Sequence, residues 1–266
     1  MLALPIVDFS SSNASEQLRA ACTDVGFFYL INHGISSVLI SQVDEMGLPL
    51  HGPNIFPDKA QFPTFQVTMA TYYVAMCELG YKVAQLFAKA AGEAEIFDQP
   101  GMFDKPMAAL RLLHYAPEKS DVANGVFGAG AHTDYGLLTL LSTDLSEGLQ
   151  IFYKNQWIKV PPRQDAFVVN LGDMAERFTN GIFKSTLHRV VNQSGKERYS
   201  VPFFYEPNFT CQVECFPSCV TETNPAKYLP TTSGQHLLKM YRRTHASFEE
   251  PRDMATREND HKMGLF

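Results

Sequence analysis

The pattern of hydrophobic and polar positions changes character once along the chain, near residue 109. Before that point, residues 67–90 place apolar side chains three and four positions apart, the period of one face of an α-helix. A shorter helix is predicted over residues 15–24. Two apolar runs of strand length, residues 4–9 and 26–34, frame it, and the second ends at a glycine turn.

Beyond that point, the chain consists of short apolar runs separated by Gly, Asp, Asn and Pro. The runs are ALRLLHYA, LLTLLST, GLQIFY, WIKV, AFVVNL, LHRVV and RYSVPFFY. Each has the length of a strand, and their regular spacing is typical of an all-β sandwich or barrel such as a jelly roll. Residues 233–248 return to a helical period and are expected to pack outside the sheets. The predicted fold class is therefore mainly β with flanking helices.

Composition supports one sizeable folded core. The chain has 266 residues, of which 45% are hydrophobic and only 19% are charged. We expect a mostly helical N-terminal region over residues 1–100 and a jelly-roll domain with a closing helix over residues 101–266. The net charge of −6 and the lack of any basic block disfavour nucleic-acid binding, because phosphate contacts need clustered Lys and Arg.

No part of the sequence indicates secretion or membrane insertion. No segment is long and apolar enough to span a bilayer, and the start, MLALPIVDFS, lacks the basic region of a signal peptide. The five cysteines are odd in number and widely spread, which is typical of reduced thiols. We therefore expect a cytoplasmic protein, and we also expect it to be a monomer.

The first candidate chemistry lies in His132-Thr133-Asp134, directly before the strand-like run LLTLLST. Residues i and i+2 of a strand point to the same face, so an imidazole and a carboxylate could converge there. His188, on another predicted strand, could supply a third ligand. Two His and one carboxylate are the ligand set of non-haem Fe(II) oxygenases, because they leave positions open for cosubstrate and dioxygen. A His-x-Asp triplet alone is a weak signal.

A second candidate follows ten residues after His188, where Arg198 and Ser200 share one face of the predicted strand RYSVPFF. Arg can bind a carboxylate through two hydrogen bonds, and a Ser hydroxyl can add a third. A buried Arg needs an anion, since leaving it unpaired costs several kcal/mol. An acidic cosubstrate would meet this need, and so would a structural partner such as Glu206 or Asp173.

Taken together, these residues stand inside a longer series of motifs that resembles the plant-type 2-oxoglutarate/Fe(II) dioxygenase superfamily, which includes isopenicillin N synthase. The matching segments, in family order, are LPIVDFS, DVGFFYLINHGI, LRLLHYAP, AHTDYGLLTLL, EGLQI, VVNLGD, TNG, STLHRVV and RYSVPFFYEP. They cover most of the chain. Coincidence does not explain so many matches in the same order.

The resemblance implies a double-stranded β-helix, or jelly-roll, core. It implies that His132, Asp134 and His188 bind Fe(II). It also implies an enzyme that couples oxidative decarboxylation of 2-oxoglutarate by O2 to hydroxylation or a related oxidation of a small organic molecule, with ascorbate as a candidate reductant. Phe204 corresponds to a position that often lines the substrate pocket in this family.

By the same resemblance, Arg198 and Ser200 hold the distal carboxylate of 2-oxoglutarate, and Tyr115 contacts the cosubstrate. The chain departs from the family near Tyr115, because the usual Asn-Tyr-Tyr-Pro segment carries Leu113 and His114 in its first two positions. One polar contact to the cosubstrate is therefore expected to be lost. On a strand, His114 would point away from Tyr115, so it is not expected to be a ligand.

A larger departure precedes Gly52. In the family, a long stretch separates the first helix and strand from the GPN-x-x-P segment, whereas here SQVDEM is followed almost at once by GLPLHGPN. Some tens of residues are missing near residues 44–52. A natural deletion and an omitted segment both fit this observation, and a real deletion would leave the pocket more open to water.

Three alternatives remain open from the sequence. Iron oxidases of the same fold use the same triad without 2-oxoglutarate and retain an Arg-x-Ser pair, so Arg198 and Ser200 do not exclude them. A catalytically impaired binding protein would explain the shortened N-terminal part, although all the motif residues are intact. A zinc hydrolase could also use two His and one carboxylate, but it would have no use for Arg198.

A second metal site is a further question, raised by Cys211, Cys215 and Cys219. These residues would share a face of a helix, but they lie in a proline-containing stretch that favours strand and loop. They are expected to be free thiols.

Overall fold

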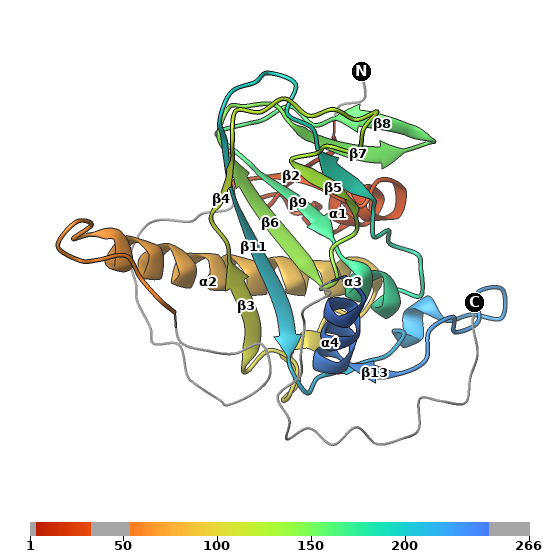
Figure 1. Ribbon diagram of the computed structural model, residues 1–266. Coiled ribbons are helices and arrows are strands. Elements are labelled where there is room, and N and C mark those ends of the chain that lie inside the picture. The colour runs from red at the N-terminus through yellow and green to blue at the C-terminus, as the bar shows by residue number, and fades with distance from the viewer. Residues whose placement is uncertain (1–3, 33–53, 245–266) are drawn as a thin grey trace.

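The computed structural model describes residues 4–32 and 54–244, and its centre is a pair of facing β-sheets (Figure 1). The strands of the larger sheet are β1 (Ile6–Asp8), β2 (Phe27–Ile31), β3 (Pro106–Leu110), β4 (Leu113–Tyr115), β6 (Leu138–Thr143), β9 (Phe167–Leu171) and β11 (Arg198–Asn208). Their order is β1-β2-β9-β6-β11-β3, with β4 also paired to β11, and all the pairs are antiparallel except β1 with β2.

The smaller sheet completes the jelly roll. Its strands are β5 (Ala129–His132), β7 (Leu149–Tyr153), β8 (Gln156–Lys159) and β10 (His188–Val190), in the order β5-β10-β7-β8. A separate two-stranded ribbon pairs β12 (Gln212–Val213) with β13 (Thr231–Thr232). The predicted double-stranded β-helix is thus confirmed.

The helices are arranged around this core. They are α1 (Ala14–Asp24), α2 (Phe65–Ala91), α3 (Asp173–Phe178), α4 (Ser233–Thr244) and the short 3-10 helices η1 (Ile96–Asp98) and η2 (Pro217–Cys219). Helix α2 runs across the outer face of the larger sheet in Figure 1, next to α1. It ends at Gly92, whose positive φ of 95° lets its N–H close the last turn on the carbonyls of Ala88 and Lys89.

Both faces of the larger sheet are buried, which explains the continuous apolar runs in the sequence. On β2, Phe28 and Leu30 face the main core under α1 and α2. Phe27 and Tyr29 face the opposite way, into a second core shared with Ile151 of the smaller sheet. A strand covered on both sides needs apolar residues at every position, because neither face meets water.

Most predicted elements are present. The helices predicted over residues 15–24 and 67–90 are α1 and α2, and the one predicted over residues 233–248 begins as α4. The run ALRLLHYA forms two strands, β3 and β4, both antiparallel to β11. The shortened region near residues 44–52 lies outside the described residues. The division at residue 100 stays a prediction, and β1 and β2 from before it join the larger sheet.

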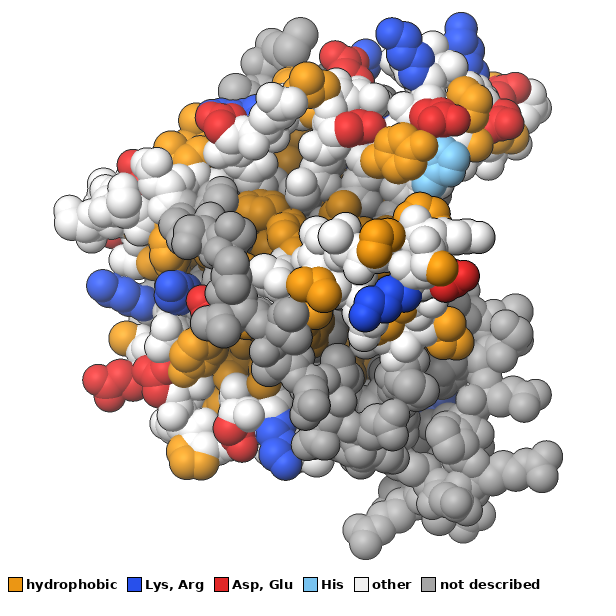
Figure 2. Space-filling view, turned by 90° about the vertical axis from the view of Figure 1, so that its left-hand side faces the viewer, with side chains coloured by type: hydrophobic (Ala, Val, Ile, Leu, Met, Phe, Trp, Pro, Cys, Tyr) orange, Lys and Arg blue, Asp and Glu red, His pale blue; other side chains and the backbone are white. Residues whose placement is uncertain are grey.

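Two further observations concern the helices and the surface charge of the described part. Within residues 4–32 and 54–244, no helix is both long and apolar enough to cross a membrane. Figure 2 shows basic side chains interspersed with acidic ones on the face it presents, without a basic patch. This face therefore lacks the electrostatic footprint of a nucleic-acid site.

The aromatic side chains of the main core meet at Phe97, on the short helix η1. Four phenylalanine rings have their centroids 5.0–6.1 Å from that of Phe97, and they are Phe87, Phe103, Phe178 and Phe216. Phe97 itself is 1% exposed. It links α2, α3 and the segment before β3, so its packing holds these elements together.

We expect Phe97→Ala to lower the free energy of unfolding by about 3–5 kcal/mol, because it leaves a cavity among rings that cannot collapse together. Urea denaturation followed by circular dichroism measures the change. Phe62→Ala is the matched control: Phe62 is 53% exposed, so its loss should change the free energy of unfolding little. Equal losses in the two variants would contradict this account of the core.

Candidate metal centre

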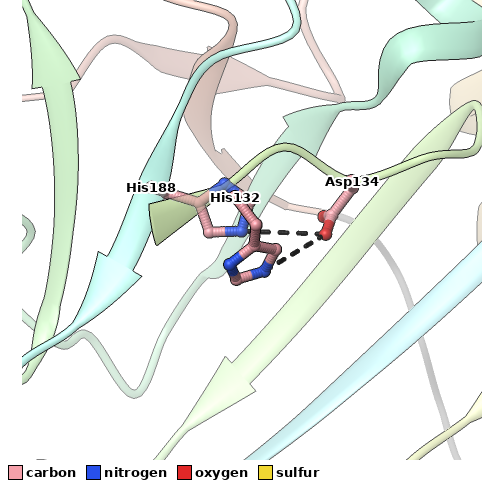
Figure 3. A group of neighbouring side chains, drawn as sticks. All are labelled: His132, Asp134 and His188. Atoms are coloured by element: carbon pink, nitrogen blue, oxygen red, sulfur yellow. Dashed lines mark ion pairs between the residues drawn. The ribbon is translucent and has the colours of Figure 1, made fainter. Parts of the chain in front are cut away.

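Three side chains predicted to bind metal lie together and point toward one another (Figure 3). His132 is the last residue of β5, Asp134 lies in the loop that follows, and His188 is the first residue of β10. Strands β5 and β10 are antiparallel neighbours, and His188 stands opposite His132 in their register. Strand pairing therefore brings the two imidazoles together although they are far apart in the sequence.

The candidate ligand atoms converge on one point. Oδ1 of Asp134 is 3.8 Å from Nε2 of His132 and 3.7 Å from Nε2 of His188. One candidate ligand atom from each of the three residues lies within 4.8 Å of the others. These separations are too long for direct hydrogen bonds, so the three atoms face one another but are not hydrogen-bonded to one another. This is the arrangement expected of ligands around an ion.

Backbone contacts determine which imidazole nitrogens face the site. Nδ1 of His132 is 2.7 Å from the carbonyl oxygen of Gly130, and Nδ1 of His188 is 3.1 Å from that of Thr186. A carbonyl only accepts, so each Nδ1 donates to it. Each Nε2 is left facing the site, which is the nitrogen available to bind a metal.

The carboxylate of Asp134 is oriented by two hydrogen bonds to its other oxygen. Oδ2 accepts from the hydroxyl of Thr139 at 2.6 Å and from the side-chain amide of Asn170 at 2.7 Å. Thr139 and Asn170 are opposite each other on the neighbouring strands β6 and β9. These bonds leave Oδ1 free. Sequence reasoning missed both orienting residues, because strand pairing between distant segments has no local signal.

The convergence of His132 and Asp134 has a different cause from the one predicted. Asp134 does not lie on the same strand as His132, since β5 ends at His132. The loop instead folds back against the start of α3, where the N–H of Asp173 donates to the carbonyl of Asp134 at 2.8 Å. A side chain at Gly172 would collide with the carbonyl oxygen of Gly136, so this close approach requires glycine.

The three side chains differ in their contact with water. The side chains of His188 and Asp134 are 10% and 11% exposed, whereas that of His132 is 44% exposed. Burial lowers the pKa of His188, and the nearby His132 also lowers it, although the charge of Asp134 opposes both. His188 therefore stays neutral near pH 7, as metal binding requires.

Arg198 and Ser200 lie on the predicted common face of β11, and both are 2% exposed. Within the described part of the chain, neither Nε nor Nη1 of Arg198 has a hydrogen-bond partner. Glu206 and Asp173 are not its partners, since Glu206 accepts from the N–H of Leu137 and Asp173 accepts from Ser185. A buried guanidinium with unused donors fits an anionic ligand that residues 4–32 and 54–244 do not supply.

The remaining predicted residues surround these groups. Tyr115 stands opposite Arg198 on β4, with the guanidinium 4.9 Å from its ring centroid. Phe204 stands opposite Thr139 on β6, the residue that orients Asp134. His114 turns to the outside and stacks on Tyr199 at 4.7 Å, as expected of a residue that is not a ligand.

The cysteines form no second site in the described chain. All five are free thiols, as predicted. Within residues 4–32 and 54–244, the only group of three or more His, Cys, Asp or Glu side chains close enough to share an ion is His132, Asp134 and His188. Cys211, Cys215 and Cys219 therefore do not hold a metal among themselves.

Comparison with known proteins agrees with this geometry. The model of the 2OG-Fe(II) oxygenase superfamily matches residues 106–207. A second model, described as the N-terminal region of the non-haem dioxygenase in morphine synthesis, matches residues 4–58. Together the two matches include every predicted site residue and the first helix and strands.

Two curated relatives extend the likeness over most of the chain. Kihadalactone A synthase of Citrus sinensis is 30% identical, covering 85% of this chain and 86% of its own length. A 2-oxoglutarate-dependent dioxygenase of Monascus ruber is 35% identical, and the match covers 77% of this chain and 85% of that protein. The match with the Citrus protein runs over 290 residues, more than the 266 of this chain, so that protein has residues with no counterpart here.

Solved structures show the same fold. A full-length protein of Neurospora crassa, in complex with alpha-KG, is 26% identical, with a TM-score of 0.77 over 91% of this chain and 96% of that one. A 2OG-Fe(II) oxygenase family protein from Caulobacter crescentus is 25% identical, with a TM-score of 0.76 over 91% and 99%.

Glu206 of β11 lies under the loop that carries Asp134, and it is a buried acid outside the candidate ligand set. It accepts a hydrogen bond from the N–H of Leu137. Burial raises the pKa of Glu206 to about 8; the Leu137 bond opposes this, and the charge of Asp134 adds to it. The folded protein therefore holds a proton that the unfolded chain, with its ordinary pKa of 4.5, has already lost at neutral pH.

This difference predicts a stability that depends on pH. The contribution of Glu206 to the free energy of unfolding is fully present below about pH 4.5 and is lost as the pH rises toward 8. Glu206→Gln cannot ionise, so it should not lose stability over this pH range. At pH 8 it should be more stable than the parent by on the order of 1–3 kcal/mol. Urea denaturation of the metal-free protein at pH 5 and pH 8 measures it. Glu95→Gln, at an exposed site, is the control, and parallel pH profiles for parent and Glu206→Gln would refute the assignment.

Proposed function

The chain belongs to the 2OG-Fe(II) oxygenase superfamily, and on that basis we propose which of its residues bind the metal and the cosubstrate. The enzyme is a non-haem iron(II) oxygenase. It couples oxidative decarboxylation of 2-oxoglutarate by O2 to hydroxylation or a related oxidation of a small organic molecule. Bound Fe(II) supplies the activation of O2, and the protein supplies positioning and a site shielded from water.

In this proposal, Nε2 of His132, Nε2 of His188 and Oδ1 of Asp134 bind the iron. The observation that carries it is the convergence of these three atoms while the other polar atom of each side chain is already hydrogen-bonded. Nothing else in the described chain competes for them. Three protein ligands leave further positions for 2-oxoglutarate and O2, which a closed four-ligand zinc site would not offer.

Arg198 binds the distal carboxylate of 2-oxoglutarate, with Ser200 and Tyr115 beside it. Support comes from the unused buried donors of Arg198, since a dianionic cosubstrate would satisfy both the charge and the hydrogen bonds. Tyr115 stands directly across the strand pair from Arg198. Phe204 stands opposite Thr139, the residue that hydrogen-bonds to Asp134, and it is our candidate for a residue that lines the substrate pocket. Ascorbate could serve as an external reductant.

This assignment also bears on the alternatives. The relatives named above include a 2-oxoglutarate-dependent dioxygenase and a structure holding alpha-KG, which favours the cosubstrate over an iron oxidase that works without it. The intact His132, Asp134 and His188 cluster speaks against an impaired binding protein. We further infer a cytoplasmic monomer without a nucleic-acid partner, from the acidic net charge and the free thiols.

His188→Ala should abolish Fe(II) binding and turnover, because two ligands cannot hold the ion against water. Anaerobic titration calorimetry with Fe(II), together with succinate release in the presence of 2-oxoglutarate and ascorbate, measures both. His114→Ala is the matched control, since His114 is exposed on the outer face. Turnover that survives in His188→Ala would show that the proposed ligand set is wrong.

Arg198→Met should have opposite effects on binding and on stability. Loss of the guanidinium should raise the KM for 2-oxoglutarate by about 100-fold, since a buried ion pair is broken. The ligand-free protein should gain about 1–3 kcal/mol, because an unpaired buried cation is removed.

Arg163→Met, at a surface ion pair with Asp165, is the control for Arg198→Met. Steady-state kinetics and urea denaturation provide the two readouts. An unchanged requirement for 2-oxoglutarate would favour the oxidase alternative, and a destabilised ligand-free protein would mean that Arg198 has an internal partner.

A further inference from the structure

Helix α4 lies beside the loop that carries Asp134, although about a hundred residues separate the two in the sequence. Figure 1 shows α4 next to α3, near the end of β6 where that loop enters the sheet. Helix α4 contributes no candidate ligand and no residue to the cosubstrate site. Its side chains instead converge on one residue of the loop, Tyr135, the chain neighbour of Asp134.

Three residues of α4 contact Tyr135 at three different points. Nε2 of His236 is 2.9 Å from the backbone carbonyl oxygen of Tyr135, so this nitrogen carries the proton and donates it. The hydroxyl of Tyr135 donates to Oγ1 of Thr244 at 2.7 Å. The ring of Tyr241 meets the Tyr135 ring edge to face, with centroids 5.7 Å apart. Backbone, ring and hydroxyl of Tyr135 are thus all held by one helix.

The opposite side of the same loop is held by α3. The N–H of Asp173 donates to the carbonyl of Asp134 at 2.8 Å, and the N–H of Met174 lies 3.0 Å from the carbonyl of Gly136 and 3.2 Å from that of Tyr135. The carbonyl of Tyr135 therefore receives its shorter bond from His236, at 2.9 Å. Without His236, the backbone of Tyr135 would lose its bond to α4, and only the ring and hydroxyl contacts with Tyr241 and Thr244 would remain on that side of the loop.

The position of α4 is fixed by contacts that do not involve the loop. The N–H of Gly234 donates to the carbonyl of Phe209 at 2.8 Å, and that of Ser233 donates to Cys211 at 2.9 Å. A side chain at Gly234 would collide with the Phe209 ring, so only glycine lets the helix approach so closely. The helix is therefore anchored independently at its start and can serve as a fixed support for the loop.

We propose that His236 is a positioning residue for the metal centre. Through Tyr135 it sets where Oδ1 of Asp134 stands relative to the two imidazoles, with Thr244 as a second point of support. The role rests on the proposed function, because it presumes that Asp134 binds iron. Its physical basis is that a carboxylate on a loop needs a rigid support to stay within reach of ligands on neighbouring strands.

The test compares His236→Phe, which keeps a ring but has no donor, with His236→Gln, whose amide can still donate. Anaerobic titration calorimetry with Fe(II) alone should show about tenfold weaker binding for His236→Phe. His236→Gln should stay within about threefold of the parent. His114→Phe is the matched control on the outer face and should bind as the parent does. Equal affinity in His236→Phe and the parent would overturn the proposal, and so would equal losses in the Phe and Gln variants.

A readout that needs no iron separates this proposal from the ligand assignment. Hydrogen exchange of the metal-free protein, followed by mass spectrometry, should show about tenfold faster exchange in the peptide that contains residues 135–140 of His236→Phe, with α2 unchanged. Unchanged exchange in that peptide would overturn the role of α4. If the parent protein binds no Fe(II) but His236→Phe still shows the faster exchange, the ligand assignment is refuted and the role of α4 is not.

A second pair of variants covers the case in which His236→Phe does not fold. Tyr135→Phe and Thr244→Val each remove the hydroxyl bond at the exposed end of α4, and each should weaken Fe(II) binding by about threefold. Thr244→Val also removes the bond from Oγ1 to the carbonyl of Met240, so the double variant should bind Fe(II) no more weakly than Thr244→Val alone. Additive losses, or none, would contradict the second point of support.

Discussion

The structure depends most on how the Asp134 carboxylate is held. One of its oxygens accepts hydrogen bonds from Thr139 and Asn170, which face each other across two strands of the larger sheet. The other oxygen is left facing the imidazoles of His132 and His188, which belong to the smaller sheet. The candidate metal centre therefore spans the two sheets of the jelly roll. It can form only when both sheets are complete and packed together, so the chemistry is tied directly to the fold.

The packing of the larger sheet makes this possible. Because the sheet is covered by α1 and α2 on one face and by the smaller sheet on the other, its central strands cannot shift register without exposing apolar side chains. The loop after β5 is held in place in turn, because it is hydrogen-bonded to the start of α3 and to α4. The two histidines need less support, since strand pairing and a backbone carbonyl at each Nδ1 already fix their rings.

Two buried ionisable groups show where stability is given up for function. Arg198 is a buried cation whose Nε and Nη1 lack hydrogen-bond partners in the described chain, and Glu206 is a buried acid whose pKa is raised to about 8. Each would be costly in an ordinary core. Arg198 is explained by the anionic cosubstrate that we propose it binds. Glu206 is explained by its position under the Asp134 loop, where it accepts the N–H of Leu137 and stays protonated at neutral pH.

The sequence by itself determined the elements and the chemical groups. Period and strand length predicted α1, α2 and the jelly-roll strands, because these signals are local, and the ordered series of motifs along most of the chain indicated the family. Only the tertiary structure decided how these groups are held. Asp134 proved to be a loop residue, and Thr139, Asn170 and His236 support it from segments that lie near it only after folding. Such contacts depend on strand register and helix docking, which no local pattern of residues encodes.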